Sequence, residues 1–212
     1  MDHMLIVING DITDYSYYSR LIETVDTVVV VDGGSRHIDA LGVEPDVLLG
    51  DFDSIVGFER FVEQYPSVDV VQFPPRKNFT DSELAVEYAI DKKPAKVTLV
   101  GCIGSRMDHT LSTVLLLKKF LDAGIEARML NENNEIRLID KPVSLTGEVG
   151  DIMSLIPISE QVTGIYLKGF EYPLNDATLV LGSSTGISNV FASETARVEL
   201  RNGLLLVFKS RD

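Results

Sequence analysis

Short apolar runs alternate with segments of helical spacing over the first 130 residues, and this alternation limits the possible folds more than any other feature of the chain. The runs are rich in β-branched residues and lack a clean in-and-out alternation, which is typical of strands buried on both faces of a parallel sheet. The pattern predicts a doubly wound α/β domain with a mostly parallel sheet. The expected strands cover residues 5–8, 28–31, 47–49, 68–73, 97–100 and 127–130.

Helical spacing fills the gaps between these runs. It is clearest in the last gap, where Gly124 follows as a C-terminal stop and one face carries Leu111, Val114, Leu115, Lys118 and Leu121. The expected helices cover residues 15–23, 35–41, 58–64, 81–91 and 108–123.

The chain changes character after Asn131, where the apolar runs are short and punctuated by Gly, Pro and Asn. Short strands at close spacing predict a small antiparallel β-sandwich or barrel. Asn202 and Gly203 lie between the last two runs and favour a hairpin with a type I′ turn. We place the domain boundary between residues 135 and 136. The expected strands cover residues 136–139, 143–145, 152–156, 162–167, 178–181, 190–192, 196–200 and 204–208.

The acidic balance of the chain argues against one class of partner. The sequence has 32 acidic and 19 basic residues, a net charge of −13, whereas a protein that binds nucleic acid through its phosphates needs a basic surface. The apolar runs are too short for a membrane span or a signal peptide, and the single cysteine, Cys102, fits a reducing compartment. We therefore expect a cytoplasmic protein with no nucleic-acid or membrane partner.

Two carboxylates, Asp51 and Asp53, follow the third expected strand. In extended backbone, side chains at i and i+2 point to the same side, and ligands of open α/β sheets bind outside the carboxyl ends of the strands. Such a pair suits Mg²⁺, which prefers a few carboxylates together with water and substrate phosphates. The alternative is that Asp53 or Ser54 only caps the next helix, but this leaves Asp51 without a role. We favour the metal site.

The next strand end is followed by Lys77, Thr80 and Asp81. Thr80 and Glu83 form a capping-box pattern, which by itself is a structural explanation. Lys77 and Asp81 lie beside the same helix N-terminus, where a cation and a carboxylate suit a phosphate and its counter-metal. Taken alone, the helix cap is the favoured interpretation of this segment.

A third segment of this kind follows the fifth expected strand. Gly101 and Gly104 let the backbone approach a ligand, and Arg106 offers a planar fork for phosphate oxygens. The Gly-Lys-Ser/Thr ending of a Walker A motif is absent. Asp108 can cap the helix, and for His109 an ordinary first-turn position is the favoured interpretation.

A fourth strand end carries Asp32, Gly33 and Gly34. Two glycines suit close approach to a nucleotide, although a Gly-Gly turn is a weak signal. A doubly wound sheet brings all four strand ends to one edge. Structural roles explain each segment alone but explain all four together less easily.

Four short motifs follow one another along the chain: Gly50-Asp51-Phe52-Asp53-Ser54, Lys77 with Thr80-Asp81, Gly104-Ser105-Arg106-Met107-Asp108-His109, and Gly186-Ile187-Ser188-Asn189. In this order and spacing they resemble the thiamine pyrophosphokinase family, over nearly the whole chain. The resemblance implies an N-terminal α/β catalytic, nucleotide-binding domain, residues 1–135, and a C-terminal β-sandwich that binds thiamine, residues 136–212.

The resemblance also implies a reaction. A diphosphate group passes from ATP to the hydroxyl of thiamine, giving thiamine diphosphate and AMP, with magnesium. Asp51, Asp53 and Asp81 are implied to bind the metal, and Lys77 and Arg106 to neutralise phosphate charge. Asp81 or Asp108 is a candidate to accept the hydroxyl proton. The implied nucleotide contacts are Asp32, Gly33, Gly34, Thr80, Gly104, Arg106, Asp108 and His109.

Thiamine is implied to bind near Ser188 and Asn189, in a homodimer whose active sites lie between subunits. Some relatives stack thiamine on a tryptophan. This chain has none, so a tyrosine or phenylalanine is expected in that role.

Three positions depart from the family's pattern, namely Asn78, Ser105 and Val190. Related sequences often have Asp, Gly and an acidic residue at these places. These departures keep open the alternative of a catalytically silent nucleotide- or thiamine-binding regulator. A phosphotransferase that acts on another small alcohol is a further alternative.

Overall fold

The computed structural model describes residues 2–53, 55, 57–73 and 79–211. The chain forms two compact units, Met1–Glu132 and Asn133–Asp212. Within the described ranges, no helix combines the length and the apolar character needed to cross a bilayer.

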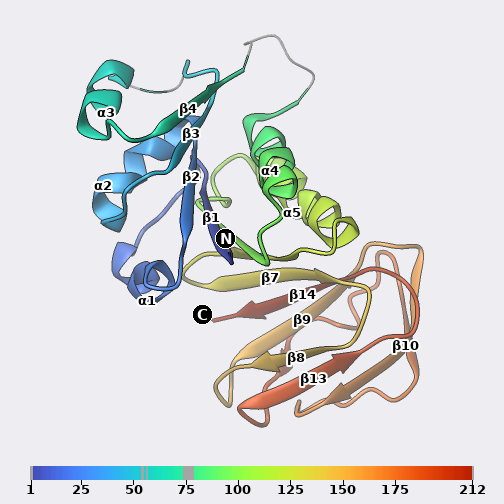
Figure 1. Ribbon diagram of the computed structural model, residues 1–212. Coiled ribbons are helices and arrows are strands. Elements are labelled where there is room, and N and C mark those ends of the chain that lie inside the picture. The colour runs from blue at the N-terminus through green and yellow to red at the C-terminus, as the bar shows by residue number, and fades with distance from the viewer. Residues whose placement is uncertain (1, 54, 56, 74–78, 212) are drawn as a thin grey trace. The chain divides into compact units, whose positions relative to one another are not determined.

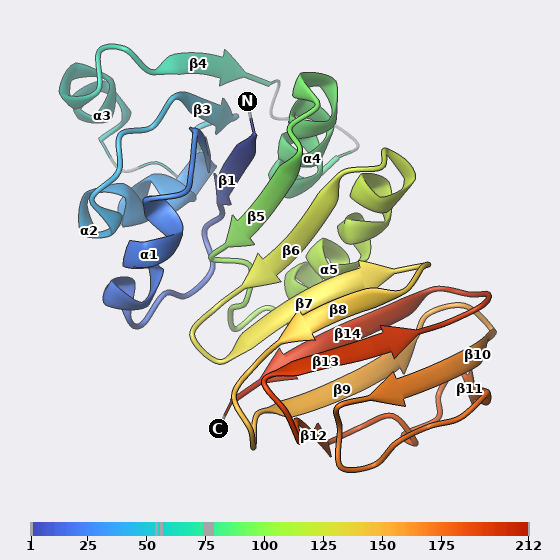
Figure 2. The ribbon, with the colours of Figure 1, turned by 60° about the horizontal axis from the view of Figure 1, so that its bottom comes forward.

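A parallel sheet forms the centre of the first unit (Figure 2). Its strand order is β6-β5-β1-β2-β3-β4, and every neighbouring pair is parallel. The chain thus adds strands outward from β1 on one side and then returns to add β5 and β6 on the other. This confirms the predicted doubly wound topology. The strands are β1 (His3–Val7), β2 (Thr27–Val31), β3 (Val47–Gly50), β4 (Asp69–Gln72), β5 (Lys96–Val100) and β6 (Glu126–Leu130).

Burial on both faces holds for β1, β2 and β3 but not for β4. In β4, Asp69, Val70 and Gln72 are exposed because this strand lies at the edge of the sheet. The prediction of a fully buried strand there is wrong. The polar residues Asp69 and Gln72 in this run indicated an exposed strand.

Helices cover both faces of this sheet (Figure 1). The first two predicted helices are instead short 3₁₀ segments that each continue into a single α turn. In the second of them Gly33 and Gly34, poor helix formers, occupy the start. The elements are η1 (Tyr15–Tyr18), α1 (Ser19–Ile22), η2 (Asp32–His37), α2 (Ile38–Leu41), α3 (Phe58–Gln64), α4 (Asp81–Lys92) and α5 (Met107–Asp122).

Helix α5 buries a face that shares Val114 with the predicted one but excludes Leu111 and Leu115. Its buried residues include Val114, Leu117 and Phe120, whereas Leu111 and Leu115 are 58% and 48% exposed. Apolar spacing alone does not say which of two apolar stripes faces the core. Gly124 does follow the end of the helix with a φ of 72°, as its stop role requires.

The second unit is a sandwich of two antiparallel sheets, β12-β9-β14-β7 and β11-β10-β13-β8 (Figure 2). Side chains from both sheets form one buried core, among them Leu155 and Val207 from the first sheet and Val162 and Val198 from the second. The strands are β7 (Asn134–Ile139), β8 (Val143–Thr146), β9 (Ile152–Pro157), β10 (Gln161–Lys168), β11 (Ala177–Val180), β12 (Asn189–Val190), β13 (Thr195–Glu199) and β14 (Leu205–Ser210).

The predicted hairpin at Asn202-Gly203 is wrong. The strands that flank it, β13 and β14, belong to opposite sheets and do not pair with each other. Gly203 has a φ of 105° but Asn202 does not have positive φ, so the turn is not type I′. Asn202 instead forms an isolated bridge with Thr163.

Candidate active site

The loops that follow β1, β2, β3 and β5 lie at one edge of the first unit, because parallel strands end on the same side. The strand order reverses direction between β1 and β5, the place where open α/β sheets bind their ligands. The polar residues singled out in the sequence therefore follow strands that end at this carboxyl edge.

Three carboxylates from two of these loops come together. Asp32, Asp51 and Asp53 each place an oxygen so that all three lie within 4.8 Å of one another. Asp32 is buried, Asp51 is half-buried and Asp53 is exposed, so the group opens to solvent on one side. Like charges this close repel each other unless a cation or a proton offsets them. Three hard oxygen donors fit Mg²⁺ or another hard divalent cation.

Local backbone geometry builds this group of three aspartates. Asp32 begins η2 with a φ of 45°, a left-handed conformation that aspartate tolerates better than most residues. Gly50 lies beside it, since a Cβ atom at Gly50 would be 3.0 Å from the Asp32 Cβ. The end of β3 can therefore approach Asp32 only because Gly50 has no side chain.

Asp51 and Asp53 share a side for a reason other than the one predicted. Phe52 between them has a φ of 68°, so the segment turns and is not extended. The Asp53 backbone N–H donates to the Asp51 carboxylate at 3.3 Å. Asp53 does not take the alternative role of N-cap, because Gly57 occupies that position in α3. Ser54, the other residue considered for this role, lies outside the described residues.

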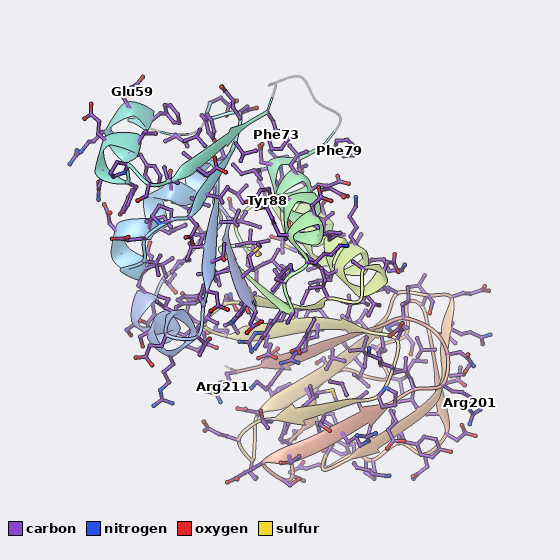
Figure 3. The ribbon with its side chains drawn as sticks, in the orientation of Figure 1. Glu59, Phe73, Phe79, Tyr88, Arg201 and Arg211 are labelled. Carbon is purple, nitrogen blue, oxygen red and sulfur yellow. The ribbon has the colours of Figure 1, made fainter. Side chains whose placement is uncertain are left out.

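Asp81 lies in the first turn of α4 and is not part of the three-aspartate group. Thr80 caps this helix by accepting the Glu83 backbone N–H at 3.2 Å, which confirms that half of the capping box. Phe79 precedes the cap and is about half exposed, and Figure 3 shows it with Phe73 at this end of the unit. Lys77 and Asn78 lie outside the described residues.

Arg106 and Asp108 form an exposed ion pair at the start of α5. Arg106 is the N-cap residue, so the predicted capping role of Asp108 is wrong. The Arg106 guanidinium donates to both Asp108 oxygens, at 3.2 and 2.5 Å. This hydrogen-bonded pairing lowers the pKa of Asp108 to about 2. Ser105 and His109 are also exposed here.

Most of the glycines at this edge are required for close packing within the protein itself, whether or not a ligand is bound. A Cβ atom at Gly34 would lie 2.4 Å from the Val7 carbonyl oxygen, and one at Gly101 only 2.2 Å from that of Ile8. At Gly33 a Cβ would meet the Asn9 side chain at 2.3 Å. Gly104 differs, because the nearest atom would be 3.6 Å away. Of these four glycines, only Gly104 could carry a Cβ atom at ordinary van der Waals distances from its neighbours.

The second unit contains a pocket of 340 Å³, within the size range of small-molecule sites. It brings together the two predicted thiamine residues, Ser188 and Asn189, and a residue that the sequence did not identify, Tyr172. Tyr172 is 63% exposed. The remaining lining residues are Leu167, Leu174, Thr185, Gly186 and Ile187.

Asn189 holds the pocket together rather than pointing a free amide into it. Its Oδ1 accepts the backbone N–H groups of Tyr172 at 3.1 Å and Val190 at 2.8 Å, and its Nδ2 donates to the Tyr172 carbonyl at 2.7 Å. The side chain is buried. Asn189 therefore fixes Tyr172 beside Ser188, whose φ of 60° turns the chain at the pocket wall.

Two family models match the chain, one in each unit. Residues 18–129 match the model described as thiamin pyrophosphokinase, catalytic domain. Residues 139–205 match the one described as thiamin pyrophosphokinase, vitamin B1 binding domain. The chain belongs to the thiamine pyrophosphokinase family.

Two bacterial members of the family resemble this chain over nearly all of their length. The thiamine pyrophosphokinase of Bacillus subtilis (strain 168) is 32% identical over 209 residues, which is 95% of this chain and 92% of that protein. A crystal structure of the Bacillus subtilis protein matches with a TM-score of 0.89 at 30% identity, covering all of both chains. A structure of thiamin pyrophosphokinase from Geobacillus thermodenitrificans gives 0.87 at 28% identity, covering 99% and 98%.

The two matched segments correspond to the two sites described above. The segment that matches the catalytic-domain model contains the three-aspartate group. The segment that matches the vitamin B1 binding model contains every residue of the pocket.

Proposed function

We propose that this protein transfers a diphosphate group from ATP to the hydroxyl of thiamine, giving thiamine diphosphate and AMP in a magnesium-dependent reaction. The observation that carries the proposal is the group of three carboxylates at the carboxyl edge of the sheet, inside the segment that matches the family's catalytic domain. The names of the similar proteins support thiamine as the acceptor.

Net charge explains why such an enzyme needs a cation. The first unit has 22 acidic and 12 basic residues, a net charge of −10, which opposes binding of a polyphosphate. Asp32, Asp51 and Asp53 would hold the metal, with Asp81 as the further ligand expected from the sequence. When bound, magnesium neutralises charge on the phosphate oxygens and aligns them.

In the proposed reaction, the thiamine hydroxyl oxygen bonds to the β-phosphorus of ATP. The bond from that phosphorus to the oxygen it shares with the α-phosphate breaks, and AMP leaves. Arg106 and Lys77 would stabilise charge on the transferred group. Because Arg106 is paired with Asp108, nucleotide binding would exchange one anionic partner for another.

One residue must accept the proton that the hydroxyl loses. The candidates for this role are Asp81 and Asp108. Thr80, Gly104 and His109 are proposed nucleotide contacts, while Gly33 and Gly34 shape the loop beside Asp32 through their packing.

We assign thiamine to the pocket of the second unit. Tyr172 offers an exposed aromatic face for the cationic thiazolium or for the pyrimidine ring, and thus takes the place of the missing tryptophan. Ser188 would contact the substrate, whereas Asn189 would act by holding Tyr172.

We also propose a cytoplasmic homodimer with its active sites between subunits. Support for association comes from an exposed apolar stripe on α5, formed by Met107, Leu111 and Leu115 at intervals of one helical turn. Replacement of Leu111 by Glu would then shift the molar mass measured by light scattering from that of a dimer to that of a monomer.

Product identification tests the proposed reaction. The protein is incubated with ATP, Mg²⁺ and thiamine, and the products are identified by mass. Thiamine diphosphate with AMP is the expected pair. ADP as the product would indicate transfer of a single phosphoryl group, and thiamine binding without any ATP consumption would indicate a silent regulator.

A further inference from the structure

A hydrogen-bond chain with the buried His37 at its centre runs from Tyr15 through His37 to Gly10, at the carboxyl edge but apart from the three aspartates. The Tyr15 hydroxyl lies 2.8 Å from His37 Nδ1, and His37 Nε2 lies 2.9 Å from the Gly10 carbonyl oxygen. His37 is 2% exposed, and its ring lies 5.8 Å from that of Tyr15.

The partners fix the protonation of His37. A carbonyl oxygen only accepts hydrogen bonds, so Nε2 must carry a proton and donate it to Gly10. Burial lowers the pKa of His37, so near neutral pH the ring is uncharged and Nδ1 accepts from the Tyr15 hydroxyl. The chain is therefore directional, from Tyr15 to His37 to Gly10.

Gly10 is held from two sides. Its carbonyl also accepts from the Arg36 guanidinium at 2.9 Å, while its N–H donates to the Gly101 carbonyl at 2.6 Å. One residue on, the Asp11 N–H donates to the Ile103 carbonyl at 2.8 Å. The loop after β1 is thus clamped between η2 and the loop after β5.

The clamp acts on the segment that carries Asp32. Asp32 is the first residue of η2 and His37 the last, so the hydrogen bond at His37 fixes one end of this short segment and Asp32 lies at the other. Loss of that bond would leave the exposed Arg36, which also bonds to the Asn9 and Gly10 carbonyl oxygens, to hold η2 against the loop after β1, so η2 would be held less firmly.

We propose that His37 is a positioning residue for the nucleotide side of the active site, which holds η2, and with it Asp32, in register with the β1 and β5 loops. The inference rests on the proposed function for its kinetic consequence only. Its structural part concerns the loop itself and is measured without turnover.

Two variants of His37 and one matched control test this role. His37→Leu removes both hydrogen bonds at similar volume, and His37→Gln keeps an N–H donor near the position of Nε2. The control is His3→Leu. His3 is also buried, but lies at the opposite end of β1 with hydrogen bonds to Thr24 and Thr98.

In kinetics, we expect His37→Leu to raise the KM for ATP about tenfold and leave the KM for thiamine within about twofold, because only the nucleotide side shifts. His37→Gln should recover most of the loss, and His3→Leu should leave both KM values unchanged. Equal KM values for ATP in wild type and His37→Leu would overturn the inference, as would an equal rise in the His3→Leu control.

Amide hydrogen exchange separates this inference from the proposed reaction. His37→Leu should speed exchange at the Gly10 and Asp11 amides while Ile6 within β1 keeps its protection. Unchanged exchange at Gly10 and Asp11 would refute the clamp even in an active enzyme. If the wild-type protein formed no thiamine diphosphate, the proposed function would fail, and the exchange result would still decide the role of His37.

Discussion

The carboxyl edge of the first unit is charged and tightly built, whereas the pocket of the second unit is lined by neutral side chains and open. The edge gathers three carboxylates in a unit of net charge −10. The pocket combines aliphatic residues, one tyrosine and hydroxyl and amide groups, in a unit with 10 acidic and 7 basic residues. Under the proposed function, electrostatics would govern phosphate transfer in the first unit and shape would govern acceptor binding in the second.

The largest expected effect comes from neutralising an aspartate at the charged edge. Asp53→Asn should lower kcat at least about 100-fold, because one charged ligand of the cation that neutralises the phosphates is lost. Thiamine binding, measured by calorimetry, should not change. Asp122→Asn is the matched control, since it removes the same charge from an exposed pair with Lys118 on α5. Near-wild-type turnover in Asp53→Asn would show that this carboxylate has no role in the reaction.

Tight packing at the same edge predicts the next effect. Gly101→Ala should destabilise the protein by several kcal/mol, on the order of 3, because its Cβ would overlap the Ile8 carbonyl and its φ of 64° is unfavourable with a side chain. Gly104→Ala should cost less than about 1 kcal/mol. Urea denaturation measures both variants. Equal stability of the two would mean that the loop relaxes freely.

At the open pocket, Tyr172→Ala should raise the KM for thiamine about tenfold, the range of one aromatic stacking contact, and leave the KM for ATP unchanged. Tyr172→Phe keeps the ring and should stay close to wild type. Steady-state kinetics with each substrate varied in turn separates the two constants. A rise in the KM for ATP instead would contradict the assignment of thiamine binding to the second unit.

The smallest expected effect is a dependence of folding stability on pH, confined to the first unit. Burial lowers the pKa values of His3 and His37, so the unfolded chain binds protons first as the pH falls. The two uncharged histidines make their full contribution to the free energy of unfolding above the usual histidine pKa of about 6.5. Below that pH the contribution is lost, by at most about 1.4 kcal/mol per pH unit for each residue.

Hydrogen exchange measures this pH effect in each unit separately. Between about pH 6.5 and 5, amides of β1 should lose protection while those of β14 keep theirs, because no histidine follows His109 in the sequence. In the double variant His3→Gln, His37→Gln, the protection of the β1 amides should no longer depend on pH in this range. Earlier loss of protection in β14 would contradict the assignment to these histidines.

Much of the fold follows from local sequence pattern. Buried β-branched runs predict β1, β2 and β3, and Gly124 predicts the end of α5, because these features depend on the residues themselves. The face that α5 buries and the exposure of β4 depend on what packs against them. The Asn202-Gly203 hairpin failed for the same reason, since a turn signal does not say which sheet the next strand joins.

The site was predictable in chemistry but not in geometry. Asp51 and Asp53 were identified from their place after a strand, yet their convergence depends on the left-handed Phe52, which gives no signal in the sequence. Asp32 was expected near the nucleotide and lies with them. Tyr172 gave no signal either, because the hydrogen bonds that bring it to Ser188 come from Asn189, 17 residues further along the chain.

The most direct test of the three-aspartate group is a titration of Mn²⁺ or Mg²⁺ followed by calorimetry, in wild type and in three single Asn variants at Asp32, Asp53 and Asp122. We predict one saturable site whose affinity falls at least about tenfold in Asp32→Asn and Asp53→Asn and stays unchanged in Asp122→Asn. Equal affinity in all four proteins would contradict a cation held between the loops after β2 and β3.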